Sequence, residues 1–304
     1  MLEKFRLGVI FLGLLAGCSS AWGEPVPPGA SQMTLHLSQA DLLVHTYRPQ
    51  CHAPSLLIVL HGMGRNAESY MKAARPLADQ HCLLIAAPLF DEERFPAWRY
   101  HQGGIAQHRR IQPSSQWTGR LVVELAERIG TLERRNVPYS VIGHSAGGQF
   151  LARIAAFVPT DAQRIVIANP GTHVWPSLSV DAPFGLGGVY SQGGGEAALR
   201  RYLELPITIY LGSEDTSEKN LNESAEAMAQ GANRRERGLN AFTAAQHVAR
   251  EHSWKFNWRL VEARGVGHSA RDMFASPSAW RALRAEGIGP PRREVTPPVG
   301  TPPG

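Results

Sequence analysis

Residues 138–150, Pro138-Tyr139-Ser140-Val141-Ile142-Gly143-His144-Ser145-Ala146-Gly147-Gly148-Gln149-Phe150, decide the fold. The apolar run from Tyr139 to Ile142 predicts a buried strand, and apolar residues recur at helical spacing from Phe150 onward. The Gly-x-Ser-x-Gly turn between them, centred on Ser145, is typical of a nucleophile elbow when strand and helix flank it. Composition alone yields about 0.2 chance matches to this pattern in such a chain, so the turn needs support from residues elsewhere.

That support comes from two strand ends downstream. A serine hydroxyl is a weak nucleophile and needs a base, which in turn needs an orienting acid. Behind an elbow the expected chain order is Ser, then Asp or Glu, then His. The apolar run Ile207–Leu211 leads into Gly212-Ser213-Glu214-Asp215, and the run Trp258–Ala263 leads into Arg264-Gly265-Val266-Gly267-His268. We predict His268 as the base and Asp215 as the acid. Glu214 is the alternative acid, because adjacent side chains leaving a strand point to different sides and only one can face His268.

An oxyanion intermediate requires two backbone N–H donors close to the serine. Ala146 follows the serine directly and is the first expected donor. The second should come from the loop after the apolar run Leu56–Leu60, and Met63 is our choice, with Gly64 as the alternative. His61, in the same loop, is expected to organise the loop rather than to act as a base.

Alternating strand and helix patterns along the chain indicate an α/β fold. The strand runs are continuously apolar, which predicts a mostly parallel sheet of about eight strands with helices on both faces. The expected strands are Met33–Leu37, Leu42–Tyr47, Leu56–Leu60, Leu83–Ala87, Tyr139–Ile142, Ile165–Ala168, Ile207–Leu211 and Trp258–Ala263. The expected helices are Ala67–Ala78, Thr118–Glu133, one after the elbow, a polar helix within 217–230, and Ser269–Ala285.

Two long connections, 90–117 and 169–205, follow the carboxyl ends of predicted strands. Open α/β sheets bind ligands at this edge, and long loops in a compact domain are often functional. Both connections are therefore candidate walls of a substrate pocket. Their possible pocket residues are Trp98, Tyr100, His101 and Trp175.

Together, these motifs resemble the α/β-hydrolase superfamily over about residues 33–286. The resemblance is carried by the His61–Gly64 loop, the Gly143–Gly148 turn, Gly212–Asp215 and Gly267-His268. It is closest to secreted bacterial esterases related to polyhydroxybutyrate depolymerases and feruloyl esterases, through Phe256-Asn257-Trp258 and Pro183-Phe184-Gly185-Leu186. The chain has no recognisable polymer-binding module, so a small-molecule ester is the expected substrate.

The N-terminus is expected to be an export signal. Lys4 and Arg6 precede an apolar stretch that is too short to span a bilayer, followed by small residues. Leu15-Ala16-Gly17-Cys18 resembles the lipobox of bacterial lipoproteins; the alternative is an ordinary cleaved signal with an incidental cysteine. We therefore expect residues 1–17 to be a lipoprotein-type signal peptide and Cys18 to be lipidated. The resemblance implies a lipid anchor in the bacterial cell envelope, with Ser19 favouring the outer membrane.

The remaining boundaries follow from composition. Residues 18–32 are predicted to be a flexible tether, 33–286 the α/β-hydrolase domain, and 287–304 a proline-rich disordered tail. Cys51 and Cys82 each precede an apolar strand run, so both should lie at one edge of the sheet, where a disulfide is predicted. Two separate buried thiols are the alternative.

Several classes of partner are not expected. The net charge is +5, and its one dense cluster, Arg234-Arg235-Glu236-Arg237, reads as a solvated helix face, so nucleic-acid binding is not predicted. No Cys/His cluster has metal-ligand spacing, and no cofactor is expected. Oligomeric state has no signal in the sequence. The prediction is a serine esterase; an amidase or peptidase with the same three residues, and a non-catalytic surface-binding lipoprotein, are the alternatives.

Overall fold

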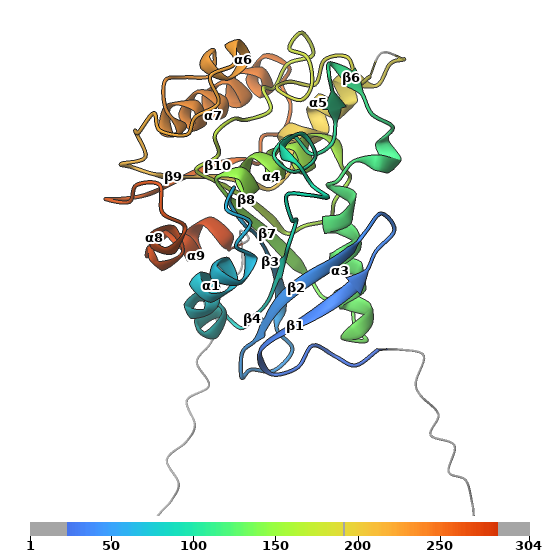
Figure 1. Ribbon diagram of the computed structural model, residues 1–304. Coiled ribbons are helices and arrows are strands. Elements are labelled where there is room, and N and C mark those ends of the chain that lie inside the picture. Colours follow the sequence, from blue (N-terminus) through green and yellow to red (C-terminus); the bar gives the residue numbers. More distant parts are fainter. Residues whose placement is uncertain (1–22, 191, 285–304) are drawn as a thin grey trace, which may run out of the picture.

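The computed structural model describes residues 23–190 and 192–284, and its centre is an eight-stranded sheet (Figure 1). The strand order is β1-β2-β4-β3-β7-β8-β9-β10. β1 pairs antiparallel with β2 and β2 antiparallel with β4, whereas every pair from β4 to β10 is parallel. The prediction of a mostly parallel sheet is confirmed. The strands are β1 (Gly29–His36), β2 (Asp41–Arg48), β3 (Ser55–Leu60), β4 (Leu83–Pro88), β7 (Tyr139–His144), β8 (Arg164–Ala168), β9 (Ile207–Gly212) and β10 (Arg259–Ala263).

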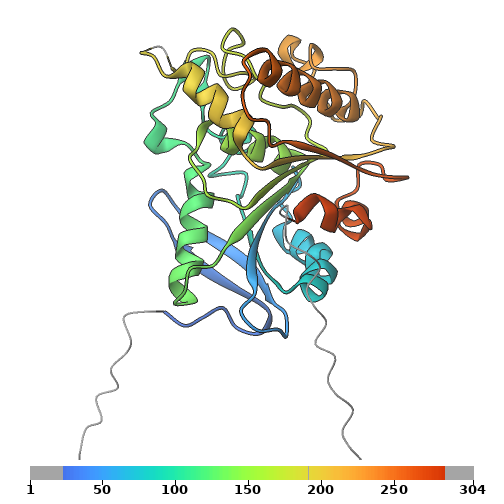
Figure 2. The same cartoon turned by 180° about the vertical axis from the view of Figure 1, so that it is seen from behind.

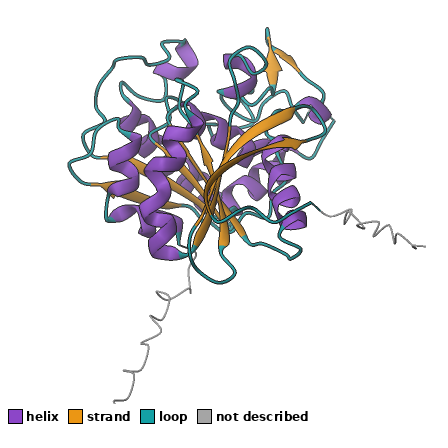
Figure 3. Cartoon of the chain, turned by 60° about the horizontal axis from the view of Figure 1, so that its bottom comes forward, coloured by secondary structure: helices purple, strands orange, loops and turns teal. Residues whose placement is uncertain are grey.

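Helices cover both faces of the sheet, as Figure 2 and Figure 3 show. Successive strand residues point to opposite faces, so a sheet covered on both sides needs continuous apolar runs. In β3, Leu56, Ile58 and Leu60 join one core, and Leu57 and Val59 join the other. The first core lies under α3 (Arg120–Leu132), α4 (Ala146–Phe157), α5 (Gly195–Glu204) and α7 (Arg234–Glu251); the second lies under α1 (Ala67–His81), α8 (Ala270–Ala275) and α9 (Ser278–Leu283).

The connections at the carboxyl edge of the sheet carry short elements of their own. Residues 90–117 contain α2 (Ala97–Tyr100), the paired strands β5 (Ala106–Gln107) and β6 (Arg110–Ile111), and a 3-10 turn at Ser114–Gln116. After β9 the chain forms a loop and then α6 (Ala225–Met228).

The prediction for the region after β9 is wrong in two respects. The polar helix expected within 217–230 is reduced to the four residues of α6, and an 18-residue helix, α7, follows, of which only Arg234–Arg237 was interpreted as helical. The final helix expected over Ser269–Ala285 is two short helices instead, because α8 ends before Pro277, a residue that starts α9.

The domain begins earlier than the predicted boundary at residue 33. β1 starts at Gly29, where the register pairs it with Arg48 at the end of β2. Val26 is buried, and its N–H donates to Glu133 Oε1 (3.1 Å). The expected tether 18–32 is therefore shorter at its C-terminal end, because residues from Val26 onward are bound to the domain.

A disulfide joins Cys51 and Cys82, as predicted. Cys51 lies before β3 and Cys82 directly before β4, two parallel neighbours whose first residues, Ser55 and Leu83, are in register. The bridge therefore lies at the amino ends of these strands, at the edge opposite the loops described below.

The predicted signal peptide 1–17, the lipidation site Cys18 and the tail 287–304 lie outside the described residues. Within residues 23–190 and 192–284, no helix is both long enough and apolar enough to cross a membrane.

Candidate active site

Ser145 lies in the tight turn between β7 and α4. Its backbone has φ 57° and ψ −116°, a region that residues with a side chain rarely adopt. The turn is compact enough that a Cβ on Gly143 would lie 2.2 Å from the Gly147 carbonyl oxygen, and one on Gly147 would lie 2.4 Å from that of Leu60. Only glycine fits at these two positions, which explains the spacing of the motif.

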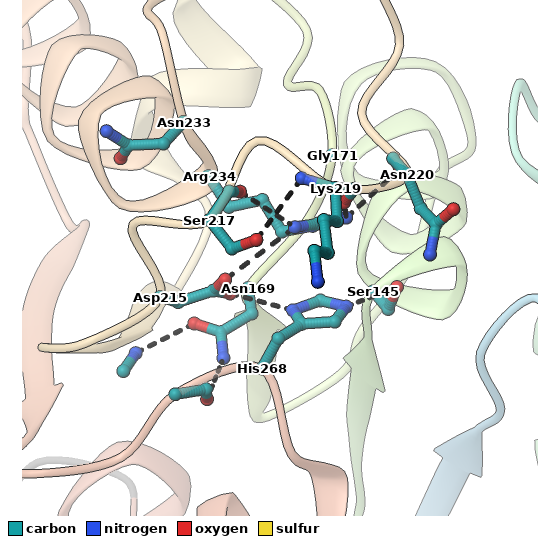
Figure 4. A network of polar contacts seen from close by, with 12 residues as sticks. Ser145, Asn169, Gly171, Asp215, Ser217, Lys219, Asn220, Asn233, Arg234 and His268 are labelled. Atoms are coloured by element: carbon teal, nitrogen blue, oxygen red, sulfur yellow. Dashed lines mark hydrogen bonds and ion pairs between the residues drawn. The ribbon is translucent and has the colours of Figure 1, made fainter.

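His268 links Ser145 to Asp215 by two hydrogen bonds (Figure 4). Its Nδ1 lies 2.7 Å from Asp215 Oδ2, and its Nε2 lies 2.9 Å from Ser145 Oγ. A carboxylate accepts hydrogen bonds only, so Nδ1 carries the proton and Nε2 is free to accept from the serine hydroxyl. Asp215 is 1% exposed, whereas Glu214 is exposed, so the structure brings Asp215 rather than Glu214 to His268.

Asn169, at the end of β8, fixes the two strand ends that carry these residues. Its Oδ1 accepts from the Gly212 N–H (2.7 Å), and its Nδ2 donates to the Gly267 carbonyl (3.4 Å). The side chain is buried and joins the β9 exit to the loop before His268. Sequence reasoning missed Asn169; its position directly after an apolar strand was the available signal.

The first turn of α7 contributes two buried arginines. Arg234 Nη1 lies 3.7 Å from Asp215 Oδ1, an oxygen without a hydrogen-bond partner among the described residues. Arg234 also donates to the carbonyls of Ser217 (3.4 Å), Lys219 (2.9 Å) and Asn220 (3.0 Å). Arg237 is fully buried and donates to the carbonyls of Gly231, Gly171 and Asn222.

These contacts correct the prediction that Arg234–Arg237 forms a solvated helix face. Arg234 and Arg237 are three residues apart and share one face of α7. That face is covered by the loops around Gly171 and 217–222, whose carbonyls accept from the guanidinium groups. Only Arg235, paired with Glu262, and the exposed Glu236 lie toward solvent.

A cavity of about 550 Å³ opens beside Ser145 and His268. Met63 and Ala146, the expected oxyanion donors, line it, and Met63 is 56% exposed. A larger cavity of about 1140 Å³, lined by Tyr139 and parts of α3, lies at the opposite edge of the sheet and contains none of these residues. The smaller cavity is therefore the candidate site, because Ser145 and His268 line it.

Of the four predicted pocket residues, His101 alone lines this cavity. Tyr100 is fully buried and donates from its hydroxyl to the His61 carbonyl (2.7 Å), because it packs inside the core with Phe90. Trp98 lines a separate small cavity, and Trp175 is half-buried outside the site, with its N–H bonded to the Phe184 carbonyl. These three predictions are wrong.

The cavity walls only partly match the two predicted loops. Ala97, His101, Gln102 and Gly171 contribute, but Ser217 and residues 219–222 form a third wall that sequence reasoning assigned to a helix. No cluster of three or more His, Cys, Asp or Glu that could hold a metal ion occurs in the described part of the chain.

The other histidines near the site are held neutral. His61 donates from Nδ1 to the Gly62 carbonyl (2.9 Å) and accepts the Phe90 N–H at Nε2 (3.1 Å), which makes it the loop organiser that was expected. Burial lowers the pKa of His61 and of His101 to about 4. Burial, with His268 close by, lowers the pKa of His144 well below its usual value; its ring lies 4.7 Å from that of His268.

Comparison with known proteins identifies solved structures that share this architecture. No protein-family model and no curated protein matches the sequence. Among solved structures, poly(aspartic acid) hydrolase-1 from Sphingomonas sp. KT-1 is 32% identical, with a TM-score of 0.77 over 84% of this chain and 100% of that chain. LpqC, a poly(3-hydroxybutyrate) depolymerase from Bordetella parapertussis, is 31% identical, with a TM-score of 0.75 over 81% of this chain and 87% of that chain.

A thermostable esterase shares only the fold, at 11% identity and a TM-score of 0.53 over 83% of this chain and 61% of that chain. The two relatives above 30% identity cover more than two thirds of the chain and are both hydrolases. The chain therefore belongs to the α/β-hydrolase superfamily, in the group of hydrolases related to polyhydroxybutyrate depolymerases.

Proposed function

We propose that the protein is a serine hydrolase that cleaves carboxylic esters through an acyl-enzyme at Ser145. The observation that carries the proposal is the hydrogen-bond chain Ser145–His268–Asp215, with distances of 2.9 and 2.7 Å, beside an open cavity. These distances lie within the range that proton transfer from a nucleophile to a general base requires.

The proposed proton transfers follow this chain of hydrogen bonds. His268 Nε2 takes the hydroxyl proton as Ser145 Oγ attacks the ester carbonyl carbon. The Asp215 carboxylate stabilises the resulting imidazolium. His268 then gives the proton to the departing alcohol as the carbon–oxygen bond breaks. Water, activated by His268 in the same way, cleaves the acyl-enzyme and releases the carboxylic acid.

The developing oxyanion is proposed to bind the N–H groups of Met63 and Ala146. Ala146 is the first residue of α4, whose N-terminal N–H groups are free of intrahelical partners. Met63 lines the same cavity from the loop after β3. The neutral His61 supports this proposal, because its ring forms hydrogen bonds with the Gly62 carbonyl and the Phe90 N–H and so holds that loop in place.

Covalent labelling tests the proposal most directly. A fluorophosphonate is expected to label the wild-type protein but not Ser145→Ala, and the variant should lose at least about 1000-fold in kcat on a p-nitrophenyl ester. Folded wild-type protein that is not labelled would favour the non-catalytic alternative, a surface lipoprotein that uses the fold for binding.

Amide hydrolysis is the second candidate. One relative is named for poly(aspartic acid), a polymer linked by amide bonds. LpqC is named for poly(3-hydroxybutyrate), a polymer linked by ester bonds. The same three residues can perform both reactions, and the loops decide the leaving group. Ester and amide pairs with identical acyl groups would decide between them: we expect turnover of the ester and none of the amide, and turnover of the amide would favour the second candidate.

We also propose that the protein is exported and anchored by lipid at Cys18. The proposal rests on the apolar stretch before Leu15-Ala16-Gly17-Cys18. Replacement of Cys18 by alanine should move the protein from the membrane fraction to the soluble fraction after cell lysis. A variant that stays in the membrane fraction would refute the anchor.

A further inference from the structure

The cavity beside Ser145 has an uneven distribution of charge. Its lining includes two cations, Lys219 and Arg234, and four side-chain amides. No Asp or Glu is among the described residues that line it. Asp215 lies beneath the cavity floor, where His268 and Arg234 already face its two oxygens.

The two cations differ in how much of their bonding capacity is used within the protein. Arg234 is buried and is committed to three backbone carbonyls and to Asp215. Lys219 is exposed, and its ammonium has no ion pair or hydrogen bond with any residue that the structure describes; only its backbone N–H and carbonyl form hydrogen bonds with those residues. Lys219 is therefore the cation that remains available for a ligand.

The backbone that carries Lys219 is held in place. Its carbonyl accepts from Arg234 Nη2 (2.9 Å), and its N–H donates to Ser217 Oγ (3.2 Å). Arg237 holds the Asn222 carbonyl at the other end of the same loop. Figure 4 shows the Lys219 side chain extending from this loop toward His268 and Ser145. A fixed attachment point reduces the entropy cost of placing the ammonium against a ligand.

We propose that Lys219 binds a carboxylate on the substrate, so that the preferred ester carries a second, free acid group. This inference rests on the proposed esterase activity and names the substrate class for the same site. A neighbouring group suits such a ligand. The Asn220 amide lines the same cavity and can add a hydrogen bond.

Matched esters test the inference. A series of mono-p-nitrophenyl dicarboxylates of increasing length is compared with p-nitrophenyl esters in which an isopropyl group replaces the free carboxylate. We expect wild-type kcat/KM to favour the charged ester by about tenfold at the best length, and the preference to shrink as salt rises. Lys219→Gln should lose the preference, and Lys219→Glu should reverse it.

The ratio of the two kcat/KM values within each variant is the measurement, because it corrects for differences in the amount of active enzyme. Lys255→Gln is the matched control, since Lys255 is exposed in the segment that leads into the amino end of β10, away from the cavity. It should keep the wild-type ratio.

The outcomes separate the inference from the proposed function. Turnover of the neutral esters without a preference for the charged ones would overturn the inference alone. A preference that survives in Lys219→Gln would also overturn it, because another group would then bind the charge. If no ester of either series is turned over, the proposed esterase function fails, and this inference fails with it.

Discussion

Replacement of Arg234 tests whether the first turn of α7 builds the active site. Methionine at this position keeps the length and apolar part of the side chain but removes every donor. The carbonyls of Lys219 and Asn220 lose hydrogen bonds of 2.9 and 3.0 Å, and Asp215 loses the cation at 3.7 Å. The loop that forms the third wall of the cavity would then lack its attachment to α7.

The size of the effect follows from these contacts. Hydrogen bonds to a charged group contribute about 1.5–3 kcal/mol each. Lys219 and Asn220 are exposed, so water can replace part of what their carbonyls lose. We therefore expect Arg234→Met to lower the free energy of unfolding by about 3 kcal/mol, which corresponds to a fall of about 6–12 °C in Tm. Loss of loop position and of the charge near Asp215 should lower ester kcat/KM by about tenfold or more.

Two further variants separate charge from geometry. Arg234→Lys keeps a cation, but an ammonium cannot bind several carbonyls at once as the planar guanidinium does. Relative to Arg234→Met, it should therefore recover part of kcat, while KM stays above the wild-type value. Arg235→Met, on the same helix turn, removes only a partly exposed pair with Glu262 and should change Tm and kcat/KM little. Thermal melts and ester kinetics on all three decide the matter. Wild-type values for Arg234→Met, or an equal loss in Arg235→Met, would refute the reasoning.

Three other predictions concern stability. Removing the bridge with Cys51→Ser and Cys82→Ser opens a loop with a sequence separation of 31 and should cost about 3–4 kcal/mol in urea unfolding, with kcat/KM unchanged in the folded protein. Gly147→Ala places a Cβ 2.4 Å from a backbone oxygen and should cost about 3 kcal/mol or more, whereas in Gly64→Ala the nearest atom is 3.6 Å away and the melting curve should stay near wild type. The pKa of His61 is about 4 when folded and 6.5 when unfolded, so the unfolded state binds more protons between these values; stability should rise by up to about 3 kcal/mol from pH 4 to 6.5, and less in His61→Asn.

Local sequence signals predicted the sheet and the three residues at its edge because those features depend on short stretches of chain. A continuous apolar run defines a strand covered on both faces, and Asp215 and His268 lie in the loops that follow β9 and β10. The tight turn at Ser145 needs glycine at two fixed positions, and the sequence displays both. Because the carboxyl ends of parallel strands lie at the same edge of the sheet, the loops that carry the three residues come together there.

The pocket walls were not predictable in the same way, because they depend on contacts between distant residues. Tyr100 was predicted to line the pocket, but its hydroxyl donates to the His61 carbonyl inside the core. Residues 217–222 were assigned to a polar helix, but carbonyls in this segment accept from Arg234 and Arg237 instead of from helical N–H groups. The burial of Arg234 and Arg237 was not predicted, because arginines in a charge cluster are typical of a solvated helix face.

Chemistry and specificity therefore have different structural origins in this protein. The proposed catalytic groups come from strand ends, and Asn169 joins two of those ends by hydrogen bonds. The wall that carries Lys219 is held by Arg234, a residue that also faces Asp215. Arg234 thus connects the orientation of the proposed acid to the position of the proposed substrate cation. A change in the first turn of α7 should alter substrate preference and turnover together, whereas a change at Lys219 should act on preference through a single ligand contact.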